Sequence, residues 1–178
     1  MKIEEISVKN IIIDNIHNLY ESAFPRDERR DFEDFLRLLA DPESRFSVYA
    51  FLEEGEFAGF ASCWRWDSFC YLEHFAVEER MRNGGRGARY LTELIRRMAL
   101  PMIIEVEPPK DDLSRRRIGF YERNGFRPAE DIEYVQPPYS RDRNAMRLML
   151  MTHGDICLKG ADDDRILRIK ADVYGVTE

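Results

Sequence analysis

The sequence has no long apolar stretch. No run of about 18 apolar residues occurs, which is the length that a membrane-spanning helix needs. Residues 1–10 mix charged residues with isoleucine and lack the apolar centre of a signal peptide. We therefore expect no membrane partner and a cytoplasmic location.

Cysteine and histidine are scarce. The three cysteines, Cys63, Cys70 and Cys157, are an odd number without CxxC spacing, and the three histidines are dispersed along the chain. Two of the cysteines lie in apolar, strand-like runs, so we expect small core residues in a reducing compartment. The sequence predicts no metal site.

Basic residues are not in excess. The formal net charge is −7, which argues against a nucleic-acid partner and suits a cationic substrate such as an amine. Hydrophobic residues make up 44% of the 178 residues, which excludes a disordered chain and predicts about one domain. We expect a single domain over residues 1–178, with a core of about 1–152 and a C-terminal helical extension at 160–176.

Periodicity predicts alternating helices and strands. The strand-like runs are 2–13, 46–52, 57–66, 69–77, 101–106 and 145–152, and the helical runs follow Asp14, span 32–39, 88–98 and 113–123, and start again at Asp162 to Asp164. Residues 126–140 are loop-rich. This order predicts an α+β fold, a mixed and mostly antiparallel sheet flanked by helices, with one strand–helix–strand unit.

A glycine-rich loop, Arg82-Asn83-Gly84-Gly85-Arg86-Gly87-Ala88, joins one of these strands to a helix. Glycines before a helix let the backbone approach a ligand closely, and the free N–H groups of the helix start attract anions, most often phosphate. A P-loop would need GxxxxGK followed by Ser or Thr, which is absent. A dinucleotide fingerprint would need a third glycine where Tyr90 stands, and further parallel repeats.

Two motifs carry a family resemblance. Arg82, Gly85 and Gly87 fit the pattern Gln or Arg, two residues, Gly, any residue, Gly or Ala, which resembles motif A of the GNAT superfamily of N-acetyltransferases. Downstream, residues 120–126, Phe-Tyr-Glu-Arg-Asn-Gly-Phe, resemble the FYxxxGF signature of the same family. The element order is similar to that of the family from Ile3 to about Thr152. The resemblance implies a GNAT-like acyl-CoA N-acyltransferase fold and acetyl-CoA as the acetyl donor.

The resemblance also implies which residues bind the donor. The pyrophosphate is expected on amides of the glycine loop, and the pantetheine arm beside the preceding strand. The predicted cofactor-binding residues are Phe75, Ala76, Val77, Arg82, Asn83, Gly84, Gly85, Arg86, Gly87, Ala88 and Ser114. Ser114 stands where the family often has Asn, and Arg117 where it often has Ala.

Acetyl transfer to an amine needs a base, an oxyanion donor and an acid. Glu73 is the first candidate base, because strict alternation puts it on one strand face with Tyr71, Phe75 and Val77, opposite Leu72, His74 and Ala76. Glu105 on the neighbouring strand is the second candidate. Tyr121 is the candidate acid, and a backbone N–H near Val77 is the expected oxyanion donor.

These residues predict an N-acetyltransferase that moves an acetyl group directly to a primary amine of a small molecule or peptide. The alternative is a catalytically inactive acetyl-CoA-binding regulatory module. The resemblance implies that residues 24–30 and 136–139 border the acceptor site. Trp64 and Trp66 are candidates to line that pocket, but they point to the same strand face and we expect them to fill core. The acceptor stays unidentified, and we expect a monomer or a homodimer.

Overall fold

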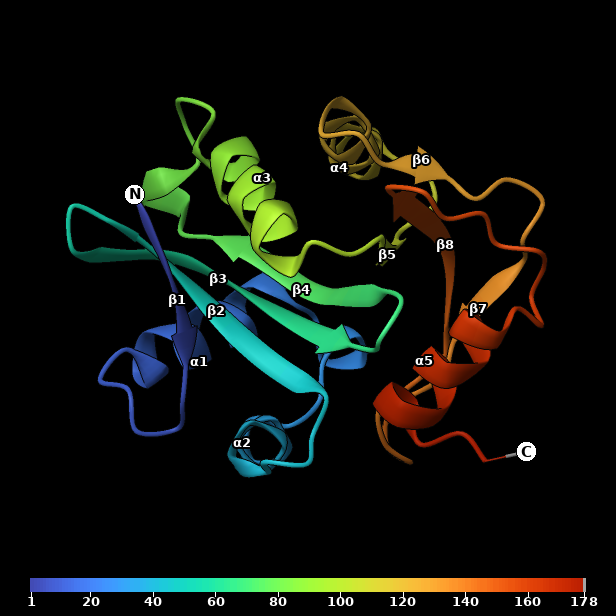
Figure 1. Ribbon diagram of the computed structural model, residues 1–178, viewed down its shortest axis with the longest axis horizontal. Coiled ribbons are helices and arrows are strands. Elements are labelled where there is room, and N and C mark those ends of the chain that lie inside the picture. The colour runs from blue at the N-terminus through green and yellow to red at the C-terminus, as the bar shows by residue number, and fades with distance from the viewer. Residues whose placement is uncertain (178) are drawn as a thin grey trace.

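A mixed sheet runs through the molecule and carries helices on both faces (Figure 1). The computed structural model describes residues 1–177. The strands lie in the order β1-β2-β3-β4-β5-β8-β6, and β7 pairs with β8. Strands β1 to β4 are antiparallel neighbours, β4 runs parallel to β5, and β8 runs antiparallel to β5. The predicted α+β class with a mostly antiparallel sheet is confirmed.

The elements have the following bounds. The strands are β1 (Lys2–Ile6), β2 (Phe46–Glu53), β3 (Glu56–Arg65), β4 (Cys70–Val77), β5 (Met102–Val106), β6 (Arg127–Pro128), β7 (Tyr134–Gln136) and β8 (Met146–His153). The helices are α1 (Ile13–Ala23), α2 (Phe32–Ala40), α3 (Arg86–Met98), α4 (Asp112–Arg123) and α5 (Asp164–Tyr174). Two short 3-10 turns, η1 (Arg26–Glu28) and η2 (Glu79–Met81), precede α2 and α3.

The core has two layers, one on each face of the sheet. On one face, Ile16 of α1, Phe35 of α2 and Ile169 of α5 pack against the sheet. On the other face, Leu91 of α3 and Ile118 of α4 do so. Figure 1 shows α3 and α4 on one side of the strands and α1 and α2 on the other. Each helix thus buries the apolar stripe that its 3.6-residue period predicts.

The N-terminal strand is shorter than its β-branched content predicts. The expected strand at 2–13 ends at Ile6, because the amide of Ser7 donates to Oδ1 of Asn10 and the amide of Asn10 donates back to the Ser7 carbonyl. This local turn replaces the ladder bonds that a longer strand would need. Helix α1 then starts at Ile13, one residue before the expected cap at Asp14.

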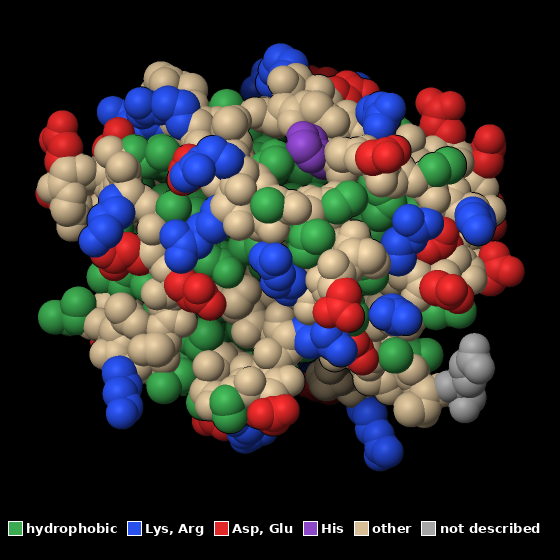
Figure 2. All heavy atoms as spheres, in the orientation of Figure 1, with side chains coloured by type: hydrophobic (Ala, Val, Ile, Leu, Met, Phe, Trp, Pro, Cys, Tyr) green, Lys and Arg blue, Asp and Glu red, His purple; other side chains and the backbone are tan. Residues whose placement is uncertain are grey.

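Charges of both signs are interspersed over the face of the molecule shown in Figure 2. In the described part of the chain, no helix is both long and apolar enough to cross a membrane.

Candidate active site

The glycine loop adopts the backbone that its sequence predicts. Gly84 (φ 72°) and Gly85 (φ 70°) both lie in the left-handed region, and Gly85 caps the start of α3. The first N–H groups of α3, from Arg86 onward, have no partner within the helix. They point out of the helix start, where its dipole is positive, so the loop offers an anion site.

The arginines of this loop shape it from within. Nε of Arg82 donates to the carbonyl of Val77 at 3.0 Å, and Nη1 of Arg86 donates to the carbonyl of Asn83 at 3.0 Å. Gly87 and Ala88 are partly buried in the first turn of α3. The loop is therefore fixed to the end of β4.

Strands β4 and β5 separate after three residue pairs. Cys70 to Leu72 pair with Met102 to Ile104, and beyond them β5 continues along β8 only. The amide of Glu78 donates to Ala58 on β3, so alternation turns the amides of Phe75 and Val77 to the opposite edge of β4. That edge is open over its last residues and leads to the glycine loop.

A β-bulge occurs at Glu73, where β4 leaves β5. Leu72 pairs with Cys63 and His74 pairs with Ser62, so Glu73 is an extra residue without a partner on β3. The expected strict alternation is wrong here, because a bulge shifts all later residues to the other face. Phe75 and Val77 pack with the α3 and α4 layer, whereas Tyr71 and Ala76 belong to the opposite layer.

The bulge turns Glu73 and His74 to the same side. The ring of His74 lies 4.5 Å from that of Phe24, and its Nδ1 is 2.9 Å from Oγ of Ser62. Its Nε2 is 2.9 Å from the carbonyl of Glu28. His74 is thus a packed, hydrogen-bonded histidine, and it shares a face with Glu73 instead of lying opposite to it.

The Glu73 carboxylate is enclosed by donors. Nη2 of Arg30 donates to it, the Tyr139 hydroxyl lies at 3.0 Å, and Nε1 of Trp64 lies at 3.0 Å. The Glu73 side chain is 0% exposed and that of Arg30 is 8% exposed. The Arg30 guanidinium also lies 4.9 Å from the centre of the Tyr139 ring. This buried ion pair joins the segment after α1 to the bulge.

These contacts do not suit Glu73 to proton abstraction. Burial alone would raise the pKa of Glu73, but the Arg30 guanidinium and the hydrogen bonds outweigh burial and hold this pKa well below its usual range. A general base works best with a pKa near the working pH and must reach its substrate. Glu73 has neither property, so the geometry argues against the first candidate base.

Glu105 on β5 has a different environment. Its carboxylate accepts a hydrogen bond from the Tyr134 hydroxyl and one from the Tyr174 hydroxyl at 2.8 Å. Burial raises the pKa of Glu105 to about 7, although the tyrosine hydroxyls lower it in part. The residue lies at the point where β4 and β5 separate, and its carboxylate is buried there. Its pKa therefore lies where a general base can act at neutral pH.

Tyr121 lies in the last turn of α4 and is 9% exposed. Its ring packs between those of Phe120 and Phe126, each with its centre at 5.3 Å. Burial raises the pKa of Tyr121 to about 12, so the hydroxyl keeps its proton at neutral pH. The residue can therefore act as a proton donor.

Ser114 has a role that the sequence did not suggest. Its hydroxyl donates to Asp111 Oδ1 at 2.8 Å and accepts from the Asp111 amide at 3.0 Å, which completes a capping box at the start of α4. The residue is buried. The cap occupies this hydroxyl, so the expected contact of Ser114 with the cofactor has no free donor to make it.

The two segments expected at the acceptor site do meet. Nε2 of Gln136 donates to the carbonyl of Asp27 at 3.2 Å, and the amide of Asn144 donates to the Asp27 carboxylate at 2.9 Å. The arginines of this region bind within the chain, since Arg26 pairs with Asp142 and Arg30 with Glu73. They are not free anion-binding groups.

Sequence reasoning missed the tyrosines around Glu105. Tyr134 and Tyr174 are 29 and 69 residues away from it in the sequence. No local pattern marks either residue, and only the fold brings them together. Among residues 1–177, no group of three or more His, Cys, Asp and Glu side chains is arranged to hold a metal ion.

The sheet topology, with an open β4 edge that runs from a glycine-rich helix start to a carboxylate on β5, defines the acyl-CoA N-acyltransferase fold. The sequence model of the acetyltransferase (GNAT) family matches residues 13–126. The chain belongs to the GNAT acetyltransferase family.

Individual proteins agree with this assignment. A GNAT-family protein from Bacteroides thetaiotaomicron superposes with a TM-score of 0.90 at 31% identity, over 99% of this chain and 100% of that one. The Bacillus subtilis (strain 168) protein YjbC, which carries an acetyltransferase name, is 31% identical over 70 residues, which span 38% of this chain and 36% of that protein. A GNAT acetyltransferase from Elizabethkingia anophelis with acetyl-CoA bound shares the fold, with a TM-score of 0.57 at 16% identity over 85% of this chain and 96% of that one.

The ion pair at the bulge should contribute strongly to stability. Glu73→Gln leaves the Arg30 guanidinium buried without a counter-charge, so we expect the free energy of unfolding to fall by about 3 kcal/mol. The matched control, Glu56→Gln, removes an exposed ion pair with Arg80 and should change the free energy of unfolding by less than about 1 kcal/mol. Urea unfolding of the two variants measures both values.

The pH dependence has a definite sign. The folded-state pKa of Glu73 is lowered, so its stabilisation is present above the unfolded-state pKa of about 4.3 and is lost as the pH falls below it. The difference in the free energy of unfolding between the wild type and Glu73→Gln should therefore shrink below about pH 4. Equal stability of the two proteins at pH 7 would contradict the account of the bulge.

Proposed function

We propose that this protein transfers an acetyl group from acetyl-CoA directly to a primary amine of a small molecule or peptide. One observation carries the proposal: the open β4 edge runs from the glycine loop to Glu105. This edge offers backbone amides along its length, an anion site at one end and a carboxylate with a pKa of about 7 at the other.

The glycine loop and the open edge would hold the donor. The N–H groups at the start of α3 suit a pyrophosphate, and the amides of Phe75 and Val77 suit an extended arm that pairs like a strand. Acetyl-CoA supplies an activated acyl group with a thiolate leaving group. An arm that runs along this edge from the glycine loop toward Leu72 passes Val77 before Phe75. The acyl oxygen at its end would therefore lie nearer the amide of Phe75 than that of Val77, where the oxyanion donor was expected. The amide of Phe75 would donate to the oxygen as negative charge develops.

Glu105 is the base in this proposal. An aliphatic ammonium has a pKa near 10.4, so it must lose a proton before it can attack the acyl carbon. The ionised Glu105 carboxylate takes that proton, directly or through a water. Glu73 instead holds the bulge and stays ionised against Arg30.

Tyr121 is the acid. Its hydroxyl would give a proton to the departing sulfur, and its high pKa keeps that proton in place until it is needed. The cysteines of the sheet do not suit an acyl-enzyme route. Cys63 and Cys70 are buried, and burial raises the pKa of Cys70 to about 12, so its thiol stays protonated. Direct transfer is therefore favoured.

The second candidate function is an acetyl-CoA-binding module without turnover. Such a module would bind acetyl-CoA tightly and release no thiol with any acceptor. The presence of both a candidate base and a candidate acid favours activity.

Thiol release from acetyl-CoA, measured over a panel of small amines, peptides and amine-bearing antibiotics, tests the proposal. We expect at least one acceptor to support turnover, and Glu105→Gln to lower kcat/KM by about 10²- to 10⁴-fold through loss of the base. The matched control, Glu56→Gln, should leave kcat/KM unchanged. If acetyl-CoA binds but no acceptor of the panel leads to thiol release, the module without turnover is supported instead.

The pH profile of the wild type identifies the base. Glu105 acts when ionised, so kcat/KM should rise with pH through a midpoint near 7. This limb should be absent in the residual activity of Glu105→Gln. A midpoint near 4 or below would point back to Glu73.

Tyr121→Phe removes the proposed acid and keeps the packing of the ring. We expect kcat to fall by about 10²-fold or more with the KM for acetyl-CoA nearly unchanged, because the hydroxyl acts on the leaving group and not in binding. The effect should be smaller for a donor whose thiol is more acidic. Steady-state kinetics with Tyr49→Phe as the control measures this, and an unchanged kcat would exclude Tyr121 as the acid.

A further inference from the structure

The C-terminal helix α5 lies outside the region, 13–126, that the family model matches. Its buried face packs in the same layer as Tyr71, Ile103 and Tyr134 of the sheet. Figure 1 shows the helix beside β7, at the end of the sheet that carries β8. The helix is thus part of the core next to Glu105.

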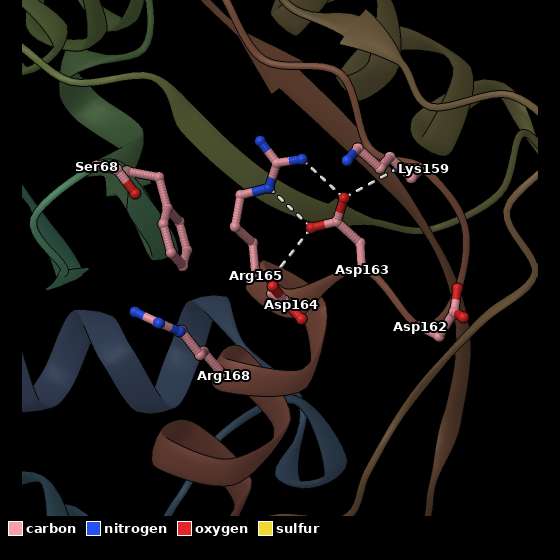
Figure 3. A pocket seen from close by; sticks show the side chains of 8 residues that line it. Ser68, Lys159, Asp162, Asp163, Asp164, Arg165 and Arg168 are labelled. Atoms are coloured by element: carbon pink, nitrogen blue, oxygen red, sulfur yellow. Dashed lines mark hydrogen bonds and ion pairs between the residues drawn. The ribbon is translucent and has the colours of Figure 1, made fainter.

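The first turn of α5 is fixed by one carboxylate. Asp163 caps the helix, accepting hydrogen bonds from the amide and the guanidinium of Arg165 and from the amide of Lys159 (Figure 3). These groups line a surface hollow of about 500 Å³ together with Ser68 and Arg168. Within this hollow Asp163 and Arg165 satisfy one another, so the start of α5 is held by its own residues.

The last turn of α5 is fixed as well. Nε1 of Trp66 donates to Asp172 at 2.8 Å, and Gly175 (φ 68°) ends the helix in a left-handed cap. Tyr174 is the final helical residue, and its ring lies 4.9 Å from that of Tyr139. Because both ends of α5 are held, the direction of the Tyr174 side chain is set by the packing of the helix in the core.

Tyr174 reaches the carboxylate of Glu105. Its hydroxyl donates to Oε2 at 2.8 Å, and Tyr134 donates to Oε1. The Tyr71 hydroxyl lies 3.0 Å from that of Tyr174. The hydrogen-bond donors around this carboxylate are thus neutral tyrosine hydroxyls, that of Tyr71 included.

The groups that face Glu105 come from several elements. They are Tyr71 and Glu73 from β4, Tyr134 from β7, Tyr139 from the loop before β8, and Tyr174 from α5. Lys170 lies over the outer face of the Tyr134 ring, 5.3 Å from its centre. Hydroxyls thus stabilise the Glu105 anion, in contrast to the guanidinium that stabilises Glu73. A cation in that place would make Glu105 a much weaker base.

We propose that α5 completes the catalytic centre, with the Tyr174 hydroxyl as the positioning residue that orients the Glu105 carboxylate and favours its ionised form. The proposal rests on the proposed function in so far as Glu105 acts as the base. It gives the helical extension a chemical role beyond packing.

Tyr174→Phe tests this directly, because it removes one donor and keeps the ring. A hydrogen bond to the carboxylate stabilises its ionised form over its protonated form. Loss of this bond should therefore raise the pKa of Glu105 by about one unit. Carboxyl ¹³C NMR titration of glutamate-labelled protein measures this shift, with the Glu105 signal assigned by its absence in Glu105→Gln. The acidic limb of kcat/KM should move up by the same amount, which lowers kcat/KM about tenfold at pH 6.

Two controls separate positioning from packing. Val173→Ala loosens the buried face of α5 next to Tyr174 and keeps the hydroxyl, so it should lower stability and leave the titration midpoint in place. Tyr49→Phe removes a hydroxyl on β2 and should move neither midpoint. If Val173→Ala shifts the titration as much as Tyr174→Phe, the effect comes from packing and the proposal is overturned.

The two readouts distinguish this proposal from the proposed function. If the Glu105 titration shifts in Tyr174→Phe but the wild type releases no thiol with any acceptor, the acetyltransferase proposal is overturned and the contact of Tyr174 with Glu105 is supported. Turnover with an unmoved NMR midpoint and an unmoved pH profile in Tyr174→Phe would overturn the role of Tyr174 alone. An NMR shift without a shift in the profile would show that Glu105 does not set the rate, which also overturns it.

Discussion

The buried ion pair between Arg30 and Glu73 is the interaction on which the site depends. It satisfies a carboxylate that the bulge in β4 turns into the α1 and α2 layer, and so it holds the bulge in place. At that residue β4 leaves β5 and its edge opens toward the glycine loop. Loss of either partner would leave a buried charge without a counter-charge, which is strongly destabilising. The ion pair that holds the bulge therefore also supports the opening between β4 and β5.

Two glutamates on neighbouring strands thereby acquire different properties. Arg30 outweighs burial at Glu73 and lowers its pKa, whereas burial outweighs the tyrosine hydroxyls at Glu105 and raises its pKa to about 7. Environments that push paired carboxylates apart in pKa commonly divide their roles. Here the division is between a residue that holds the backbone and a residue that can move a proton.

The sequence predicted the fold class and the order of the elements around the glycine loop. These rest on local patterns, such as glycines before an amphipathic helix, which survive folding largely unchanged. Glu73 does share a face with Tyr71, but the predicted faces of residues 74–77 were wrong, because one extra residue at 73 inverts the later alternation without any mark in the sequence. Tyr134 and Tyr174 were missed, because their contact with Glu105 exists only once β7 and α5 have packed.

Amide hydrogen exchange with and without CoA tests most directly whether the open β4 edge is the donor site. The amides of Phe75 and Val77 face that edge, whereas the amide of Cys70 already donates to Pro101 at 2.9 Å. Saturating CoA should slow amide exchange at Phe75 and Val77 by about tenfold or more and leave the exchange rate of Cys70 unchanged. Bound CoA that leaves the exchange rates of Phe75 and Val77 as they were would contradict the assignment of this edge as the donor site.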